Sequence, residues 1–487
     1  MIVLFNKGCE FMENLIRISL NNASKTNNGK FEGWGTSLCW WAHRIGYSPE
    51  LTKQAADLFF GENGLNLNIM RYNIGGGDNP SHNHIKRTDS AVPGWLKYDE
   101  ITKNFVYDYT ADENQLNVLR SAYEKAGESA LVEVFSNSPP YFMTKSGCTG
   151  GNTPSDTNNL KDDCYEAFAE YIAHVTEYIN NKLKINVYCV SPMNEPNTDY
   201  WHAFSEKQEG CHYDCGESQN RIIIETAKAI KDKGLNHIKI VASDETSTDK
   251  QIEEYLAYSD DVKKVLDRVN THTYGTDRIE ELGKLMSDEK MNIWMSETDW
   301  SDTLGEDAGE MGAALWLSKK IISDINALSP SAWVIWLTID HHKSINGWNG
   351  LADSGFPSTE NGYWGLAFAE HDEKKIYLSK KYYALGQFSR YIRPGDTIIH
   401  CDADTLSAYN NDSTKVTIVA VNDKKADIEK TFDLSDFKEN TANVKVIRTS
   451  GSLSYGENWK ELANFNFTNG KFNYTLKGNS ITTFIVE

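Results

Sequence analysis

Eight short runs of apolar and β-branched residues alternate with longer segments of helical periodicity over most of this chain. The runs lie at 32–35, 67–74, 130–136, 185–191, 238–242, 269–273, 292–296 and 332–337. The segments with helical period include 49–60, 112–127, 163–181, 219–234, 250–266 and 308–328. Continuous apolar strands separated by helices are typical of a parallel sheet covered on both faces. Eight such units predict an α/β fold, a (β/α)8 TIM barrel, with an open doubly wound sheet as the alternative.

The sequence changes character near residue 394. Short alternating stretches appear at 416–421, 444–449, 472–476 and 481–486, separated by clusters of turn-forming residues. This pattern predicts an appended all-β sandwich. The segment 15–20 alternates in the same way, and we expect it to join the sandwich. The predicted domains are therefore a barrel over 25–392 and a sandwich formed by 13–24 together with 393–487.

Polar and aromatic residues follow the predicted strands at their carboxyl ends. Arg71 closes the second run, Asp244 and Glu245 the fifth, His272 and Tyr274 the sixth, and Trp336 the eighth. A TIM barrel carries its active site at this face, so we expect these side chains to converge. An open sheet would not bring them to one place.

Two glutamates follow the fourth and seventh runs. Glu195 lies in SPMNEP at 191–196, and Glu297 lies in WMSET at 294–298. Glycoside hydrolysis needs two such carboxylic acids, one to protonate the leaving oxygen and one to attack the sugar. We predict Glu195 as the general acid/base and Glu297 as the nucleophile, with Asp299 and Asp302 as rivals of Glu297. The alternative for Glu195 is a helix cap, because Asn and Pro flank it.

Five further residues are candidates for substrate binding. Asn194 is placed to hydrogen-bond the sugar 2-hydroxyl, a contact that strengthens in the transition state. Arg71 is expected to hold the nucleophile ionised through a charge-assisted pair. We expect His272 and Tyr274 to contact sugar hydroxyls and Trp336 to stack on a sugar ring. The alternatives are a structural salt bridge for Arg71 and core packing for His272 and Trp336.

Composition narrows the class of ligand. The formal net charge is −20, which disfavours nucleic acid and anionic membrane surfaces as partners. The chain lacks a run of 18 apolar residues that would cross a membrane. Its 13 Trp and 24 Tyr favour a carbohydrate ligand, because sugar rings stack on flat aromatic faces. The expected partner is an oligo- or polysaccharide, and the sequence leaves the oligomeric state open.

The sequence predicts neither a cofactor nor a metal ion. It contains no phosphate-binding loop and no His-Glu-x-x-His zinc motif, and Cys211 and Cys215 have no matching second pair. His82 and His84 lie on a predicted loop without a carboxylate at metal spacing, so we interpret them as solvated or substrate-contacting. The first residues lack the pattern of a signal peptide. We expect a cytoplasmic protein, or a secreted one if a signal has been removed.

The chain resembles glycoside hydrolase family 30 along nearly its whole length. The matching motifs are FEGWGTSLCWW at 31–41, RYNIGG at 71–76, NSPPYFM at 137–143, SPMNEP at 191–196, QEGC at 208–211 and Ser-Glu at 296–297. The resemblance implies a barrel with a side β-sandwich and a retaining β-glycosidase with acid/base Glu195 and nucleophile Glu297.

Within the family the chain looks most like the endo-β-1,6-galactanases, through residues 34–41 and 208–211. We expect Trp34, Trp40 and Trp41, together with the loop from Trp201 to Tyr213, to wall the sugar site. The expected substrate is β-1,6-linked galactose in galactan or arabinogalactan. One alternative is a β-1,6-glucanase or endo-xylanase on the same barrel. Another, of a different class, is a non-catalytic glycan-binding protein. Residues 37–41 carry no acid, unlike the glucosylceramidase branch of the family.

Overall fold

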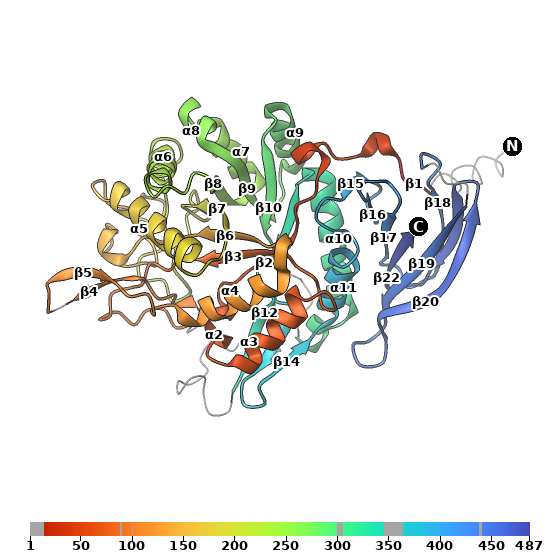
Figure 1. Cartoon of the computed structure of the whole chain (residues 1–487), viewed down its shortest axis with the longest axis horizontal. Coiled ribbons are helices and arrows are strands. Elements are labelled where there is room, and N and C mark those ends of the chain that lie inside the picture. The colour runs from red at the N-terminus through yellow and green to blue at the C-terminus, as the bar shows by residue number, and fades with distance from the viewer. Residues whose placement is uncertain (1–13, 88–89, 100, 300–304, 345–363, 438–440) are drawn as a thin grey trace.

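The computed structural model describes residues 14–87, 90–99, 101–299, 305–344, 364–437 and 441–487. Eight parallel strands close a barrel in which the last strand pairs with the first (Figure 1). In order around the barrel they are β2 (Gly33–Ser37), β3 (Ile69–Asn73), β6 (Leu131–Phe135), β7 (Val187–Ser191), β8 (Lys239–Ser247), β9 (Leu266–Gly275), β10 (Asn292–Glu297) and β11 (Ala332–Ile335). Each coincides with one of the eight apolar runs, so the predicted TIM barrel is confirmed and the open sheet is excluded.

Helices cover the outside of the barrel (Figure 1). They are α2 (Trp41–Ile45), α3 (Pro49–Ala55), α4 (Glu113–Ala126), α5 (Tyr165–Glu177), α6 (Glu217–Asp232), α7 (Thr248–Ala257), α8 (Asp260–Val265), α9 (Ile279–Glu289), α10 (Met311–Leu328) and α11 (Lys380–Ser389). Helix α4 buries Leu116, Leu119 and Ala122, whose spacing of three residues forms the stripe that packs on the strands. Every residue of β2 and β3 is buried, because helices and barrel interior cover both faces.

The helical segment predicted over 250–266 is wrong in one respect, because the structure divides it into α7 and α8. Ser259 ends the continuity: its side-chain oxygen accepts a hydrogen bond from Val262 N (3.3 Å) and so caps a new helix. Leu266 then begins β9. The apolar periodicity continues across this break and therefore hides it.

The carboxyl-terminal part forms two packed sheets. One has three strands, β1 (Leu15–Arg17), β18 (Ile428–Asp433) and β21 (Lys471–Leu476). The other has six, β15 (Thr397–His400), β16 (Thr405–Tyr409), β17 (Val416–Asn422), β22 (Ser480–Val486), β19 (Thr441–Ser450) and β20 (Glu457–Thr468). They share a core that includes Ile16, Phe432 and Phe484. The predicted sandwich is confirmed, and β1 pairs in parallel with β18, so the amino-terminal strand joins it as expected.

The sandwich packs on the barrel through α11 (Figure 1). Trp459 of β20 lies 5.1 Å from the rings of Tyr382 and Tyr383, and Thr483 donates to the Gln387 carbonyl (3.0 Å). Two small elements were not predicted: the sheet β12 (Ile339–Lys343), β13 (Ala367–Glu370) and β14 (Lys375–Leu378), and the hairpin β4 (Leu96–Asp99) with β5 (Asn104–Tyr107).

The exact domain boundaries stay a prediction. None of the helices in the described ranges is long and apolar enough to span a membrane.

Candidate active site

Glu195 and Glu297 lie together at the carboxyl-terminal face of the barrel. Glu297 is the last residue of β10, and Glu195 follows the end of β7. The Glu195 backbone has a positive φ of 48°, and its N–H donates to the Asp244 carbonyl (2.8 Å). One oxygen of each carboxyl group and one nitrogen of His272 lie within 4.8 Å of one another. Both glutamates are nearly buried, with 8% and 4% of their surface exposed.

His272 of β9 lies between the two glutamates. Its Nδ1 is 3.1 Å from Glu195 Oε1 and 3.6 Å from Glu297 Oε1, and its Nε2 is 3.1 Å from Asp244 Oδ1. Burial lowers the pKa of His272, but the charges of Glu297 and Asp244 and the hydrogen bonds to Asp244 and Glu195 raise it well above its usual value. Because carboxylates face both ring nitrogens, we assign both nitrogens as donors and the ring as an imidazolium.

Arg71 of β3 is fully buried beneath the glutamates. Its Nη1 donates to Glu297 Oε2 (3.1 Å), its Nη2 to Asp244, and its Nε to Glu133 Oε1 (2.7 Å). Burial lowers the pKa of Arg71, but the three carboxylates outweigh this effect and raise the pKa above its usual value. The guanidinium therefore stays charged. The predicted pairing of Arg71 with Glu297 is present, and the structural salt bridge offered as its alternative is present too.

The sequence analysis named Asp244 at a strand end but assigned it no role. It accepts hydrogen bonds from Arg71, from His272 Nε2 and from Ser296 Oγ (2.6 Å). Burial raises its pKa, but Arg71 and His272 lower it to about 2. A permanent carboxylate here holds His272 in its charged form. The only signal in the sequence was its position after the fifth apolar run at 238–242; in the structure β8 extends beyond this run and includes Asp244.

Each glutamate also accepts a hydrogen bond from a tyrosine. Tyr200 donates to Glu195 Oε2 (2.6 Å), and Tyr274 donates to Glu297 Oε1 (3.1 Å). Tyr200 was not predicted, because it lies in a loop without periodicity. Burial raises the pKa of Glu195, but His272, Tyr200 and Thr246 lower it below its usual value. Burial raises the pKa of Glu297 to about 7, although His272 and Arg71 oppose this rise.

The raised pKa of Glu297 differs from the sequence analysis, which expected Arg71 to hold this nucleophile ionised. Burial is the main cause of the raised pKa of Glu297, whereas the hydrogen bonds from His272 and Tyr200 hold the pKa of Glu195 low. In the free protein the proton that a general acid must deliver lies on His272, 3.1 Å from Glu195 Oε1, and it must pass to Glu195 before Glu195 can act as the acid. When Glu297 loses its negative charge, the electrostatic environment of Glu195 changes, and with it the pKa of Glu195.

The raised pKa of Glu297 leads to a prediction for the pH dependence of activity. If Glu297 must be ionised to act, kcat/KM should fall as the pH drops through about 7. It should also fall at higher pH, where His272 loses its proton. Tyr274→Phe removes a hydrogen bond to the ionised form of Glu297, raises its pKa, and should move the acidic limb to higher pH. Tyr377→Phe, which removes an exposed hydroxyl bonded to Glu373, is the control. An acidic limb that stays in place or moves to lower pH in Tyr274→Phe contradicts the assignment.

Three asparagines at strand ends have polar atoms without a hydrogen-bond partner. They are Asn194 Oδ1, Asn137 Oδ1 and both polar atoms of the Asn73 amide, all buried. Buried polar groups are normally paired, so such atoms are candidates for ligand contact. The role of Asn194 stays a prediction, and Asn73 and Asn137 join it as candidates.

The predicted tryptophans are in different places. Trp336 follows β11, is 6% exposed, and makes an edge contact with Trp40 at 5.3 Å. Trp34 and Trp41 are fully buried: Trp34 Nε1 donates to the Ile392 carbonyl (2.8 Å), and Trp41 Nε1 to the Ser37 carbonyl (2.8 Å). We correct the expectation for Trp34 and Trp41, because both belong to the packed core and have no free ring face.

Trp201 lies beneath Glu195 instead of walling a sugar site. Its Nε1 donates to the Glu195 carbonyl (2.9 Å), and only 3% of its surface is exposed. A Cβ atom at Gly210 would lie 2.1 Å from the Trp201 ring, so this close packing requires glycine. Trp201 therefore positions the backbone of Glu195. This contact gives a physical reason for the glycine of the QEGC motif.

The rival carboxylate Asp299 is fully buried and forms an ion pair with Lys381 of α11 (Nζ–Oδ1 3.0 Å). Its charge is thus paired with the helix that contacts the sandwich. Asp302 lies outside the described residues. The geometry favours Glu297 as the partner of Glu195.

Comparison with known proteins identifies the family. The model of O-glycosyl hydrolase family 30 matches residues 13–287, more than half of the chain. The chain belongs to glycoside hydrolase family 30. Family 30 enzymes hydrolyse glycosidic bonds, so this family 30 protein is a glycosidase that acts on oligo- or polysaccharides.

Three known proteins illustrate what this family 30 chain is similar to. It is 29% identical over 486 residues to an endo-β-1,6-galactanase from Hypocrea rufa, covering 95% of this chain and 93% of the relative. It is 24% identical over 536 residues to an exo-β-1,6-galactobiohydrolase from Bifidobacterium longum, covering 85% of this chain but only 35% of that larger protein. The solved structure of a conserved exported protein from Bacteroides fragilis superposes with a TM-score of 0.75, at 19% identity over 97% of this chain and all of the other. That last likeness supports the fold alone.

Proposed function

We propose that this protein is a retaining glycosidase that cleaves β-1,6-linked galactose in galactan or in oligosaccharides derived from arabinogalactan. The observation that carries the mechanism is the short distance between the glutamates, within 4.8 Å for one oxygen of each. Retaining enzymes hold their two carboxyl groups about 5–5.5 Å apart, whereas inverting enzymes need about 6.5–9.5 Å to admit a water molecule. The spacing supports retention.

The reaction proceeds in two displacements. Glu195 gives a proton to the glycosidic oxygen while Glu297 attacks the anomeric carbon, so the glycosidic bond breaks and a glycosyl ester forms on Glu297. Glu195, now ionised, takes a proton from water, and the hydroxide displaces Glu297 and releases the sugar. Arg71 and Tyr274 stabilise the departing Glu297 carboxylate. His272 supplies a hydrogen bond to Glu195 in both steps.

The choice of a neutral galactose substrate is supported by the Hypocrea relative and by the charges near the aromatic residues. Arg87 lies 4.6 Å from the Trp40 ring and already pairs with Asp340 (3.0 Å). An acidic sugar would need a basic partner to offset its loss of water. The β-1,6-glucanase and endo-xylanase activities remain the alternatives within the family, because the galactose–glucose choice depends on one hydroxyl group.

A substrate panel tests this proposal. Purified protein is incubated with β-1,6-galactan, β-1,6-glucan and glucuronoxylan, and the products are sized by chromatography. We expect the galactan to be cut fastest, with galactose or galactobiose released and little product from glucuronoxylan. Glu297→Gln protein prepared in parallel controls for contaminating enzymes. Faster cleavage of glucan or xylan would agree with the glycosidase assignment but reject the galactanase assignment.

A further inference from the structure

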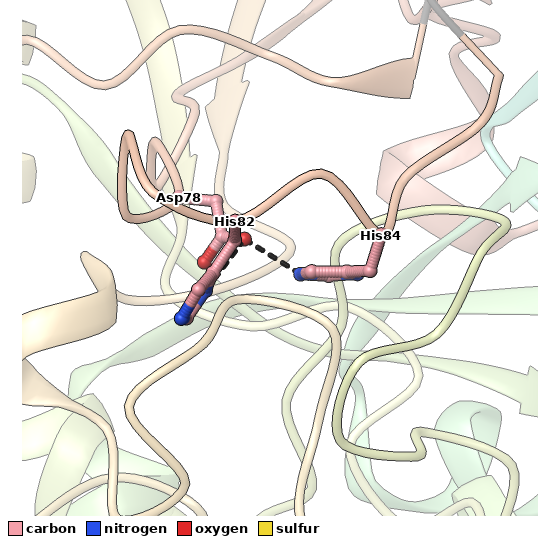
Figure 2. Close-up of side chains that lie close together, drawn as sticks. All are labelled: Asp78, His82 and His84. Atoms are coloured by element: carbon pink, nitrogen blue, oxygen red, sulfur yellow. Dashed lines mark hydrogen bonds and ion pairs between the residues drawn. The ribbon is translucent and has the colours of Figure 1, made fainter.

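We propose that Asp78, His82 and His84 bind one divalent metal ion of the zinc class, which joins three loops beside the active site. Figure 2 shows the two imidazole rings directed toward the Asp78 carboxylate. Asp78 Oδ2 lies 3.2 Å from His82 Nδ1 and 2.6 Å from His84 Nε2, and the three ligand atoms lie within 4.8 Å of one another. The sequence analysis missed this carboxylate, which stands four residues before His82.

The second nitrogen of His84 indicates how the ring is protonated. His84 Nδ1 lies 2.6 Å from the Ser205 carbonyl oxygen, which can only accept a hydrogen bond, so Nδ1 carries a proton. On a neutral ring, Nε2 would then turn a bare lone pair toward the Asp78 carboxylate. A proton or a metal ion must therefore lie between Nε2 and the carboxyl group. A histidine that donates one N–H to a backbone carbonyl and turns its other nitrogen to the site is the arrangement found at metal centres.

Asp78 is oriented in the same manner. Its Oδ1 accepts a hydrogen bond from Thr149 N (3.1 Å), which leaves Oδ2 directed at the two imidazoles. Tetrahedral zinc with bonds of about 2.0–2.1 Å places neighbouring ligand atoms about 3.3 Å apart. The separation from His82 already fits, and the separation from His84 must lengthen by about 0.7 Å by the same geometry. Water completes the coordination at this partly exposed place.

The ligand set selects the kind of ion. Imidazole nitrogens suit zinc, nickel and copper, whereas calcium and magnesium prefer oxygen ligands throughout. The second titratable cluster, Glu195 with His272 and Glu297, is a poor competitor for a cation. His272 there carries both protons, and the Arg71 guanidinium lies 3.1 Å from Glu297 Oε2.

The ion would hold together loops that follow three successive barrel strands. Asp78 and the histidines follow β3, Thr149 follows β6, and Ser205 follows β7. Phe204 packs its ring edge-on against His82 and His84, at 5.1 and 5.5 Å. The loop after β7 also carries Tyr200 and Trp201, whose hydrogen bonds hold Glu195. The ion is therefore assigned a positioning role, outside the bond-breaking steps.

Zinc binding tests the proposal directly. Protein without an affinity tag is freed of metal with a chelator and titrated with zinc chloride, with stoichiometry from mass spectrometry and affinity from calorimetry. We expect one zinc per chain, a rise in Tm with zinc, and affinity that falls as the pH drops because protons compete for the histidines. Asp78→Asn and His82→Ala should each weaken binding at least about 100-fold, since even second-shell changes cost 10–100-fold.

Three controls make the result decisive. His237→Ala removes an exposed histidine elsewhere and should leave zinc affinity unchanged. Glu297→Gln disables the other cluster and should also leave it unchanged. The visible spectrum of the cobalt-loaded protein should show tetrahedral coordination and lose it in His82→Ala. Absence of stoichiometric zinc binding, or equal binding by wild type, Asp78→Asn and His82→Ala, overturns the proposal and leaves a proton shared by His84 and Asp78.

Discussion

Glu297→Gln is expected to lower kcat by on the order of 10⁵-fold on every substrate that the enzyme cleaves. The amide keeps the size of the side chain and its contact with Tyr274, but it cannot form the glycosyl ester of the first displacement. Because this step precedes all others, a better leaving group does not compensate. The loss should therefore be similar for galactan and for an activated aryl galactoside.

The measurement compares initial rates on both substrates. Glu280→Gln, an exposed acid on α9, is the matched control and should retain full activity. Thermal denaturation of both variants separates loss of chemistry from loss of folding. A Glu297→Gln protein that is folded and keeps more than a few per cent of wild-type turnover would exclude this residue as the nucleophile.

Glu195→Gln is expected to fail in a different way. General acid catalysis contributes about 10²–10⁴-fold, so cleavage of galactan, with its poor leaving group, should fall by that factor. An activated aryl galactoside needs little protonation, so its first displacement should remain fast. The second displacement then becomes slow, because no general base activates water, and the glycosyl ester on Glu297 accumulates.

Two observations verify these roles. Mass spectrometry of the Glu195→Gln protein with an activated aryl galactoside should show a sugar attached to the peptide that contains Glu297. Added azide, which needs no general base, should restore turnover and yield a galactosyl azide. Equal loss on both substrates, with neither adduct nor azide effect, would remove Glu195 from the acid/base role.

The sequence by itself determined the barrel, the sandwich and the positions of the two glutamates. Parallel strands buried on both faces are apolar throughout, and the helices between them have a period of 3.6 residues. Both patterns can therefore be recognised in the sequence alone. Glu195 and Glu297 directly follow such strands, and the closed barrel brings the ends of its strands to one face whatever the details of the loops.

Only the tertiary structure decided which side chains of the active site contact one another. Tyr200, Asp78 and Asp244 act through loop and strand-end conformations that have no period, and Asp244 itself has a positive φ of 66°. His272 became the bridge between the glutamates because β9 lies between β7, which Glu195 follows, and β10, which carries Glu297. Trp34 and Trp336 were both expected to contact the sugar. Their different fates follow from side-chain direction: Trp34 on β2 packs against Phe388 of α11, whereas Trp336 lies beyond the end of β11. Residue type gives the chemistry of a side chain, but the direction in which it points depends on pleat, tilt and neighbours that are distant in sequence.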